Sequence, residues 1–258
     1  MSAQSPLKQL EELVRERQLP QARRHHLNTE IAASVFATSP YLTEPSFTAF
    51  HADDIQLLYE LYDEHYFGSL LSRSLNPKLI SFRLSRRMTR CGGKTTRWTD
   101  PFRRRDPWYE IAISTTLLFQ SFQDPEREIT VTGLPCHHRL DALMRIMEHE
   151  LVHLIEMLLW TDSSCSMHRF QEIARRSFGH TDHRHDLITP RETAHRQFGI
   201  RPGTRVRFDL DGHHYEGIVN RITRRATVLV VDPRGEKYSD GRRYQKFYVP
   251  LRMLEVVD

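Results

Sequence analysis

One stretch constrains this chain more than any other. "ALMRIMEHELVHLIEMLLW", residues 142–160, is apolar enough to form a core helix, yet it carries His149, Glu150 and His153 at the spacing H-E-x-x-H. Positions i and i+4 of a helix lie one above the other, so the two imidazoles project side by side and can bind one cation. Without a partner, a histidine pair on such an apolar helix would be desolvated with no compensation. The pattern therefore predicts a metal site on this helix.

The chemistry expected of the motif is that of a zinc hydrolase. Imidazole nitrogens are good zinc ligands, which makes His149 and His153 the first two predicted ligands. Helix geometry rotates Glu150 by roughly 100° from His149, so its carboxylate does not crowd into the same coordination sphere. It can instead take a proton from a water held on the metal, which then attacks a peptide carbonyl. We therefore predict Zn²⁺ as the cofactor and Glu150 as the catalytic base.

The third metal ligand is not fixed by the motif, although a catalytic zinc normally has three protein ligands. The metzincin pattern needs a glycine and a histidine where this chain has Glu156 and Leu159, which excludes that class. A second helix, expected at about 167–178, must return the ligand instead. His168 at its start is the predicted third ligand, and Cys165, His180 and His185 are the competing candidates.

A di-iron helical bundle is a weaker interpretation of the same residues. Glu150–His153 and Glu192–His195 are both E-x-x-H pairs, and such bundles use this pairing together with four long helices. Residues 79–85 and 108–114 instead alternate apolar and polar side chains, which is typical of half-buried strands. These strands do not fit a helical bundle.

The order of the elements predicts an α+β protein. A short amphipathic helix over 5–18 and a connector over 20–50 form an N-terminal segment, 1–50, and a helix capped by Asp53 opens a second region, 51–190. Composition shifts near 190–203. Residues 200–258 then show about five short strands, with turns at Asp211–Gly212 and Pro233–Gly235, and we predict a small SH3-like β-barrel.

The order of the motifs resembles that of the SprT-like domain, the metalloprotease domain also found in the Spartan proteases that clear proteins crosslinked to DNA. The resemblance covers about residues 52–185 and rests on "LYDEHYFGSLL", "ISFRLSRRMTRCGGKTTR", "WYEIAIS" and "MRIMEHELVHLIEMLLW". It implies a zincin-like minidomain with His149 and His153 as zinc ligands and Glu150 as the base. It also implies a third histidine after a variable loop. Counting from His153 gives His168, whereas aligning Phe170 with the family's phenylalanine gives Ser166. The family's C-terminal zinc ribbon has no CxxC counterpart here, and the small barrel is expected to replace it.

Positive charge is concentrated in one segment. Residues 83–105 hold nine Lys or Arg against Asp100 alone, whereas the whole chain carries a net charge of only +4. Such a concentration suggests nucleic acid as a partner, although a well-solvated hairpin is an equal reading. The predicted contacts are Arg83, Arg86, Arg87, Arg90, Arg103, Arg104 and Arg105, together with the C-terminal barrel, where Arg221, Arg224, Arg225, Tyr244 and Tyr248 could contact phosphates and bases.

These observations lead us to expect a zinc endopeptidase acting on DNA-associated or DNA-crosslinked proteins. Two other functions stay open: a non-catalytic module that binds nucleic acid or protein around a structural zinc, and a metal-dependent hydrolase of a non-peptide substrate. Three widely spaced cysteines argue against a disulfide framework, the N-terminus lacks an apolar secretory core, and no apolar run reaches the length of a membrane span. A cytoplasmic monomer is expected.

Overall fold

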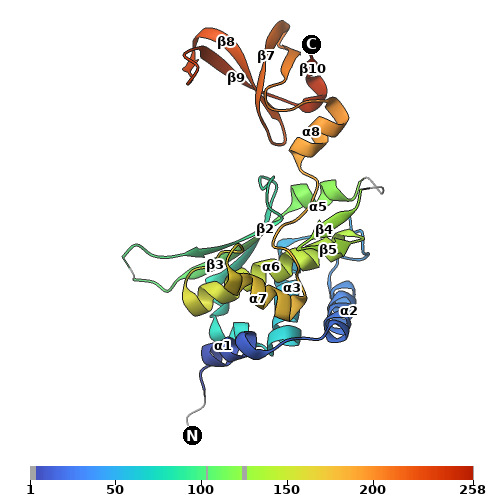
Figure 1. Cartoon of the computed structure of the whole chain (residues 1–258), viewed down its shortest axis with the longest axis vertical. Coiled ribbons are helices and arrows are strands. Elements are labelled where there is room, and N and C mark those ends of the chain that lie inside the picture. The colour runs from blue at the N-terminus through green and yellow to red at the C-terminus, as the bar shows by residue number, and fades with distance from the viewer. Residues whose placement is uncertain (1–3, 103, 124–126, 258) are drawn as a thin grey trace. The chain divides into compact units, whose positions relative to one another are not determined.

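The computed structural model describes residues 4–102, 104–123 and 127–257 (Figure 1). The chain is α+β, as predicted, and divides into two units, residues 1–187 and 188–258. The predicted boundaries need correction at both ends. Residues 1–50 belong to the first unit because their helices pack onto it, and the second unit begins at Ile188 because a further helix belongs to it.

The first unit contains seven helices within its described residues, and they surround a small sheet. In chain order its elements are α1 (Pro6–Glu16), α2 (Gln21–Thr38), α3 (Ala52–Phe67), α4 (Leu70–Ser74), η1 (Pro77–Leu79), β1 (Ile80–Ser85), β2 (Gly93–Trp98), β3 (Trp108–Ser114), α5 (Thr115–Ser121), β4 (Ile129–Val131), β5 (Leu134–Cys136), α6 (Arg139–Trp160) and α7 (His168–Phe178).

The N-terminal helices differ from the prediction in two places. The expected connector is largely helical, since α2 buries Leu27, Ile31 and Val35 against the unit. Asp53 does not cap α3. The cap is His51, whose backbone N–H donates to Asp54 Oδ2 at 2.6 Å, so the carboxylate that closes the first turn is the next one along the chain.

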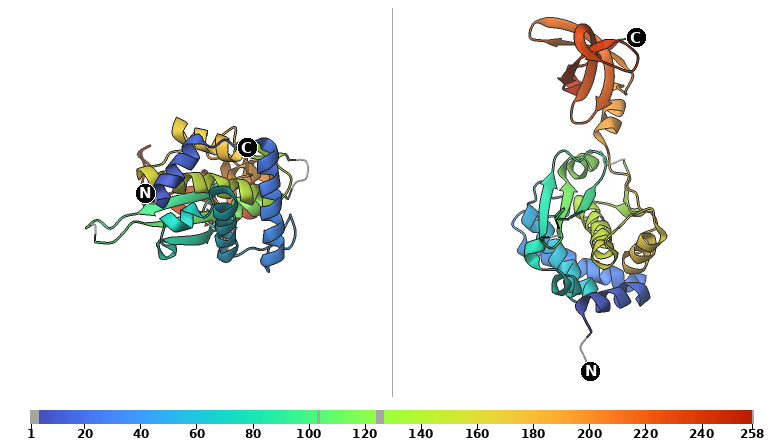
Figure 2. Two further views of the ribbon diagram at one scale, coloured as in Figure 1. Left: turned by 90° about the horizontal axis from the view of Figure 1, so that it is seen from below. Right: turned by 90° about the vertical axis from the view of Figure 1, so that its left-hand side faces the viewer.

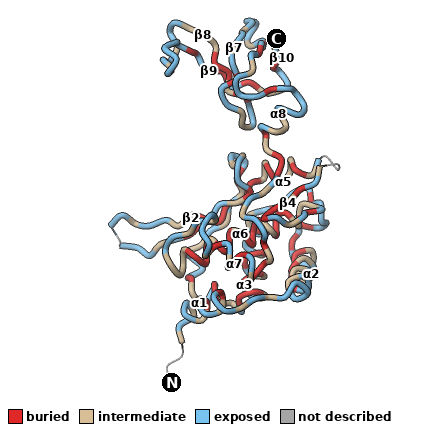
Figure 3. The backbone as a smooth tube through the Cα atoms, viewed as in Figure 1, coloured by how far each residue is buried: buried red, intermediate tan, exposed pale blue. Residues whose placement is uncertain are grey.

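Helix α6 is the centre of the first unit. It lies between the sheet and α7 (Figure 2) and is buried along most of its length (Figure 3). At its N-terminus the backbone N–H of Asp141 donates to His138 Nδ1, and at its C-terminus Thr161 adopts a left-handed conformation that ends the helix. A helix surrounded by other elements is expected to be apolar all round, which accounts for its sequence.

The sheet beside α6 has the order β1-β3-β2, with β1 parallel and β2 antiparallel to β3. β1 and β3 match the alternation seen in the sequence. β2 was not predicted, because "GKTTRW" is polar and begins with glycine, so it reads as a loop. It forms nevertheless as the edge strand, with Thr95 buried towards α6.

The second unit is a helix followed by a five-stranded antiparallel sheet of order β10-β6-β7-β8-β9. Its elements are α8 (Pro190–Phe198), β6 (Arg205–Leu210), β7 (His213–Ile222), β8 (Ala226–Lys237), β9 (Arg243–Val249), η2 (Leu251–Met253) and β10 (Glu255–Val256). Asp211 and Gly212 both have positive φ and form the predicted tight turn. The turn expected at Pro233–Gly235 is instead a register irregularity inside β8, and the chain reverses at 238–242.

The core of the second unit forms where one face of this sheet meets the chain around Ile200, and it includes Val206, Phe208, Val219 and Val228. Across the residues that the structure describes in both units, no helix combines the length and the apolar character that a membrane span requires.

Candidate metal centre

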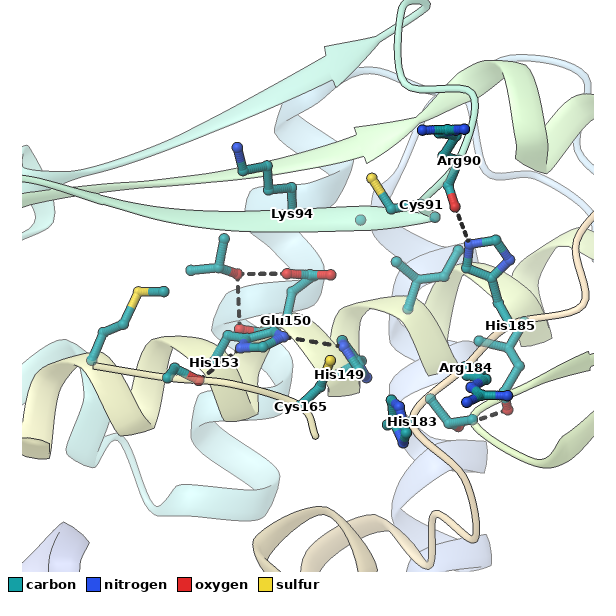
Figure 4. A pocket seen from close by; sticks show the side chains of 18 residues that line it. Arg90, Cys91, Lys94, His149, Glu150, His153, Cys165, His183, Arg184 and His185 are labelled. Carbon is teal, nitrogen blue, oxygen red and sulfur yellow. Dashed lines mark hydrogen bonds between the residues drawn. The ribbon is translucent and has the colours of Figure 1, made fainter. Parts of the chain in front are cut away.

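The two histidines of the motif face each other. His149 Nε2 and His153 Nε2 lie 3.2 Å apart on the side of α6 that borders a cavity (Figure 4). The buried ring of Phe170, from α7, packs against both imidazoles, with ring centroids 4.8 Å from His149 and 4.5 Å from His153. The i, i+4 spacing and this aromatic contact together fix the direction in which the two nitrogens point.

Cys165 supplies a third donor atom. One ligand atom each from His149, His153 and Cys165 lies within 4.8 Å of the others. Cys165 lies on the segment between α6 and α7, so the chain returns to the histidine pair just before the second helix begins. Two imidazole nitrogens and one thiol sulfur form a donor set suited to a metal ion such as zinc.

The protonation of the group also fits a metal. Burial lowers the pKa of His149 well below its ordinary value and the pKa of His153 to about 4, so both imidazoles are neutral near pH 7 and can each offer a lone pair. The buried Nδ1 of His149 has no hydrogen-bond partner within the described structure. Burial raises the pKa of the Cys165 thiol, so metal binding there would release a proton.

His168, the predicted third ligand, is not part of this group. Its side chain is exposed on α7 and lines a different cavity, together with Val14, Arg15 and Trp160. The chain comes close to the histidine pair at Cys165, three residues before α7 begins at His168. By His168 the backbone has moved away from the pair. The structure thus places Cys165, one of the competing candidates, beside His149 and His153 in place of His168.

The other two candidates also lie outside this group. His180 is buried, and its Nε2 lies 2.9 Å from Glu148 Oε2, which can only accept a hydrogen bond when ionised. His185 reaches the cavity, but its Nε2 donates to the backbone oxygen of Arg90 at 3.2 Å and its Nδ1 accepts from the backbone N–H of Leu187 at 3.3 Å. Both ring nitrogens of His185 are therefore engaged, whereas His180 Nδ1 is buried without a hydrogen-bond partner in the described structure. Neither histidine belongs to the group formed by His149, His153 and Cys165.

Glu150 lies beside the histidine pair, under the edge strand. Its side chain is buried, and the Thr95 hydroxyl lies 2.8 Å from its Oε2 and 3.0 Å from its backbone oxygen. Burial raises the pKa of Glu150 to about 7, against the two hydrogen bonds from Thr95, which lower it. A carboxyl group with a pKa near 7 is suited to accept and return a proton at neutral pH.

Gly93 allows this close approach of β2 to Glu150. A Cβ atom built on Gly93 would lie 2.5 Å from Glu150 Oε1 and 2.7 Å from its Cγ. Sequence reasoning missed both Gly93 and Thr95 as neighbours of the base. A glycine inside a strand is a sign of close backbone approach, and this signal was present in the sequence.

The cavity beside the cluster has a volume of about 580 Å³. It is bounded by α6, by β2 and the loop before it, and by the chain around residues 183–185. Arg90, Lys94 and Arg184 line it and form no ion pair within the described residues, while Glu150 is its one acidic lining residue there. The cavity is therefore basic at its mouth and holds its single carboxyl group at its base.

The predicted nucleic-acid contacts are only partly available. Arg83 makes a two-pronged pair with Glu110, with both N···O distances at 3.0 Å. Tyr244 is buried and its hydroxyl donates to Asp240, so it cannot stack on a base. Tyr248, by contrast, is exposed. The remaining arginines named above are exposed, except that Arg103 lies outside the described residues.

Three aromatic residues near the basic segment were not singled out in the sequence. Trp98 and Trp108 are register partners on β2 and β3, and their rings stack at a centroid distance of 6.4 Å while staying 48% and 38% exposed. Phe102, in the loop between these strands, is 77% exposed and lies 5.4 Å from the guanidinium of Arg104. The hairpin thus carries an exposed aromatic surface flanked by positive charge.

Comparison of this chain with family models, with curated proteins and with solved structures finds no match. The centre itself combines three donor atoms that could hold a metal ion with a buried carboxyl group whose pKa is raised.

Proposed function

We propose that this protein is a zinc-dependent endopeptidase of the SprT-like type, with a zincin-like first unit and a small SH3-like barrel as its second. His149, His153 and Cys165 would hold the zinc, and Glu150 would act as the general base. The observation that carries the proposal is the position of Glu150, buried and with a pKa of about 7, next to two imidazole nitrogens that face each other at 3.2 Å.

The division of labour follows from the surroundings of each group. A zinc ion held by these residues would supply the Lewis acidity that makes a water molecule nucleophilic at neutral pH. Glu150 would hold the proton taken from that water and pass it to the leaving amine, as a general base and acid does. Thr95 orients the Glu150 carboxylate, and Phe170 fixes the two imidazole rings.

A peptide substrate is favoured by the strand next to the base. β2 is the edge strand of its sheet and lies against α6 at Glu150. An extended peptide can add to such an edge through backbone hydrogen bonds, which would bring its carbonyl groups past the catalytic carboxylate. This arrangement distinguishes a peptidase from a hydrolase of small non-peptide substrates.

The proposed substrate is a protein associated with nucleic acid. The exposed arginines of residues 86–105 and the basic mouth of the cavity favour polyanionic surroundings. A second function, nucleic-acid binding without catalysis around a structural metal, is favoured by one specific observation: the exposed stack of Trp98 on Trp108, with Phe102 and Arg104 beside it.

One experiment separates the two functions. Zinc-loaded wild type and Glu150→Gln are incubated with an unstructured protein substrate, with and without single-stranded DNA, and cleavage is followed by gel and mass spectrometry. We expect wild type to cleave, and Glu150→Gln to keep its zinc but lose about 10²- to 10⁴-fold in rate, the usual contribution of a general base. Equal rates for the two proteins would overturn the assignment of Glu150. DNA binding without cleavage by either would favour the second function.

A further inference from the structure

The segment that follows α6 does more than supply Cys165. Ser163 Oγ lies 2.7 Å from His153 Nδ1 and 2.5 Å from Glu156 Oε2. The Glu156 side chain is fully buried, and its other oxygen, Oε1, accepts from Arg169 Nε at 2.6 Å. Arg169 is held in turn by Asp162 and by the ring of Trp160, 4.4 Å from its guanidinium. These contacts form one chain from a guanidinium to a metal-facing imidazole.

The direction of each hydrogen bond in this chain follows from its donors. Glu156 is paired with a guanidinium and, as a carboxylate, can only accept. The single hydroxyl hydrogen of Ser163 must therefore go to Glu156. The Ser163 oxygen is then left as an acceptor, so the 2.7 Å contact requires the proton of His153 to be on Nδ1. In a neutral imidazole the lone pair is then on Nε2, the nitrogen that faces His149 Nε2.

We propose that Ser163 is a positioning residue that, through Glu156 and Arg169, presets His153 as a metal ligand through Nε2. The inference rests on the proposed function for the metal site itself but concerns residues that the motif does not contain. Hydrogen bonds to the far nitrogen of a ligand histidine fix its tautomer and orientation, and their loss typically weakens metal binding 10- to 100-fold. Here a serine hydroxyl stands between the carboxylate and the imidazole.

The two histidines are unequal as a result. His149 Nδ1 is buried and has no partner in the described part of the chain, so nothing there selects its tautomer. His153 is the ligand that is ready before the metal arrives. The segment from Asp162 to Cys165 thus contributes to the centre twice, by the sulfur of Cys165 and by the hydroxyl that holds His153.

Glu156→Gln tests this directly, because it keeps the shape of the side chain, replaces one oxygen by an NH₂ group and reverses the direction of the hydrogen bonds. The amide oxygen of the glutamine would face Arg169, which leaves its NH₂ group towards Ser163. Ser163 would then accept from the amide and donate to His153 Nδ1, which moves the imidazole proton to Nε2 and occupies the ligand nitrogen. In metal-free protein, ¹⁵N–¹H imidazole spectra should show His153 protonated on Nδ1 in wild type and on Nε2 in this variant.

Zinc affinity of the full-length chain, measured by competition with a chromophoric chelator, gives the second readout. We expect Ser163→Ala and Glu156→Gln each to weaken zinc binding by about 10- to 100-fold. Ser163→Thr, which keeps the hydroxyl, should restore affinity to within about threefold. Ser164→Ala is the matched control, because the Ser164 hydroxyl contacts only Ser166 among the described side chains, and it should bind as wild type does.

The double variant Ser163→Ala/Glu156→Gln decides whether the two residues act through one hydrogen-bond network. Once Ser163 is alanine, Glu156→Gln has nothing to reverse, so the double variant should bind zinc no worse than Ser163→Ala alone, whereas independent structural damage would multiply. Wild-type affinity in Ser163→Ala, or an unchanged His153 tautomer in Glu156→Gln, would overturn this inference and leave the proposed function standing. Failure of wild type to bind zinc would instead remove the proposed function.

Discussion

Two of the buried glutamates of helix α6 lie on different faces of the helix and have opposite surroundings. Glu148 and Glu150 are two residues apart on α6, and both are buried. Glu148 is surrounded by hydrogen-bond donors on the side away from the cavity, whereas Glu150 meets only Thr95 beside it. The neighbouring side chains, and not the residue type, therefore decide which carboxylate stabilises the fold and which one is suited to proton transfer.

The face that carries Glu148 holds the first unit together. Arg145 Nη1 lies 2.7 Å and 3.0 Å from its two oxygens, and the Tyr62 hydroxyl on α3 donates to it at 2.9 Å. Asn28 on α2 and His180 complete its shell. Burial alone would raise the pKa of Glu148, but Arg145 and His180 outweigh it and lower the pKa to about 2. Its ionised form is therefore part of the folded state at any ordinary pH.

The face that carries Glu150 lacks such compensation. Burial raises its pKa to about 7, and the described structure places no cation against its carboxylate. The cation that would complete this side of the helix is the metal proposed between His149 and His153. The Glu150 carboxylate thus has no positively charged partner, among the residues that the structure describes, at the point where the proposed reaction needs a proton acceptor. A perturbed pKa of this kind is common in catalytic groups.

The largest effect is expected on the Glu148 face. Glu148→Gln leaves Arg145 and His180 without their buried anion, so it should lower the free energy of unfolding by about 3 to 5 kcal/mol at pH 7. In wild type this contribution is present above the ordinary pKa of 4.5 and is lost as the pH falls towards 2. Urea unfolding of metal-free protein measures it. Glu172→Gln, at a Glu–Arg pair on α7 whose glutamate is only half-buried, is the control and should change stability only slightly. Equal stability of Glu148→Gln and wild type would contradict the comparison.

The same substitution at Glu150 should act in the opposite direction. Its folded pKa of about 7 lies above the ordinary 4.5, so ionisation destabilises the metal-free fold as the pH rises. Glu150→Gln removes that charge and should raise the free energy of unfolding, by about 1 kcal/mol at pH 5 and about 3 kcal/mol at pH 8. Urea titrations at the two pH values with a chelator present give the difference. A gain that does not grow with pH would show that Glu150 is compensated by a group other than the metal.

A smaller effect should follow from filling the space between β2 and Glu150. Gly93→Ala places a methyl group 2.5 Å from the position of Glu150 Oε1, so the carboxylate must shift. We expect cleavage to slow by about 10- to 100-fold, or ~1.4 to 2.7 kcal/mol in activation free energy, with zinc content unchanged. Thr96→Ala on the same strand is the control and should cleave at the wild-type rate. Loss of zinc in Gly93→Ala would mean that the strand supports the ligands and not the base.

The smallest effect is expected at His168. Its exposed side chain lies away from the cluster, so His168→Ala should change zinc affinity by less than about twofold, in line with surface substitutions in general. Cys165→Ser, measured in the same chelator competition, should weaken binding clearly. The reverse result, a strong effect at His168 and none at Cys165, would favour the ligand set predicted from sequence over the proposed group of His149, His153 and Cys165.

Sequence was informative where periodicity alone determines geometry. The apolar helix around His149 and His153, the strands that became β1 and β3, and the tight turn at Asp211–Gly212 each follow from local spacing. β2 could not be recognised because its polar side chains form a strand only after β3 and α6 are in place.

The roles of the two glutamates could not be separated from sequence either. Nothing in "MEHELVH" distinguishes Glu148 from Glu150, since the partners of Glu148 come from α2, from α3 and from His180, all distant along the chain. For a related reason, the sequence did not indicate that Cys165, and not His168, lies with the histidine pair. The position of Cys165 depends on where the chain turns after α6, and the left-handed Thr161 sets that turn.

We propose that two imidazoles and one thiolate on the cavity side of α6 hold one metal ion. Metal content and X-ray absorption of the wild-type protein supplied with zinc would measure both the ion and its ligands. We predict one zinc per chain, with two nitrogen ligands and one sulfur ligand, and loss of the sulfur signal in Cys165→Ser. A protein that stays metal-free in excess zinc, or one whose zinc has no sulfur neighbour, would rule out this metal centre.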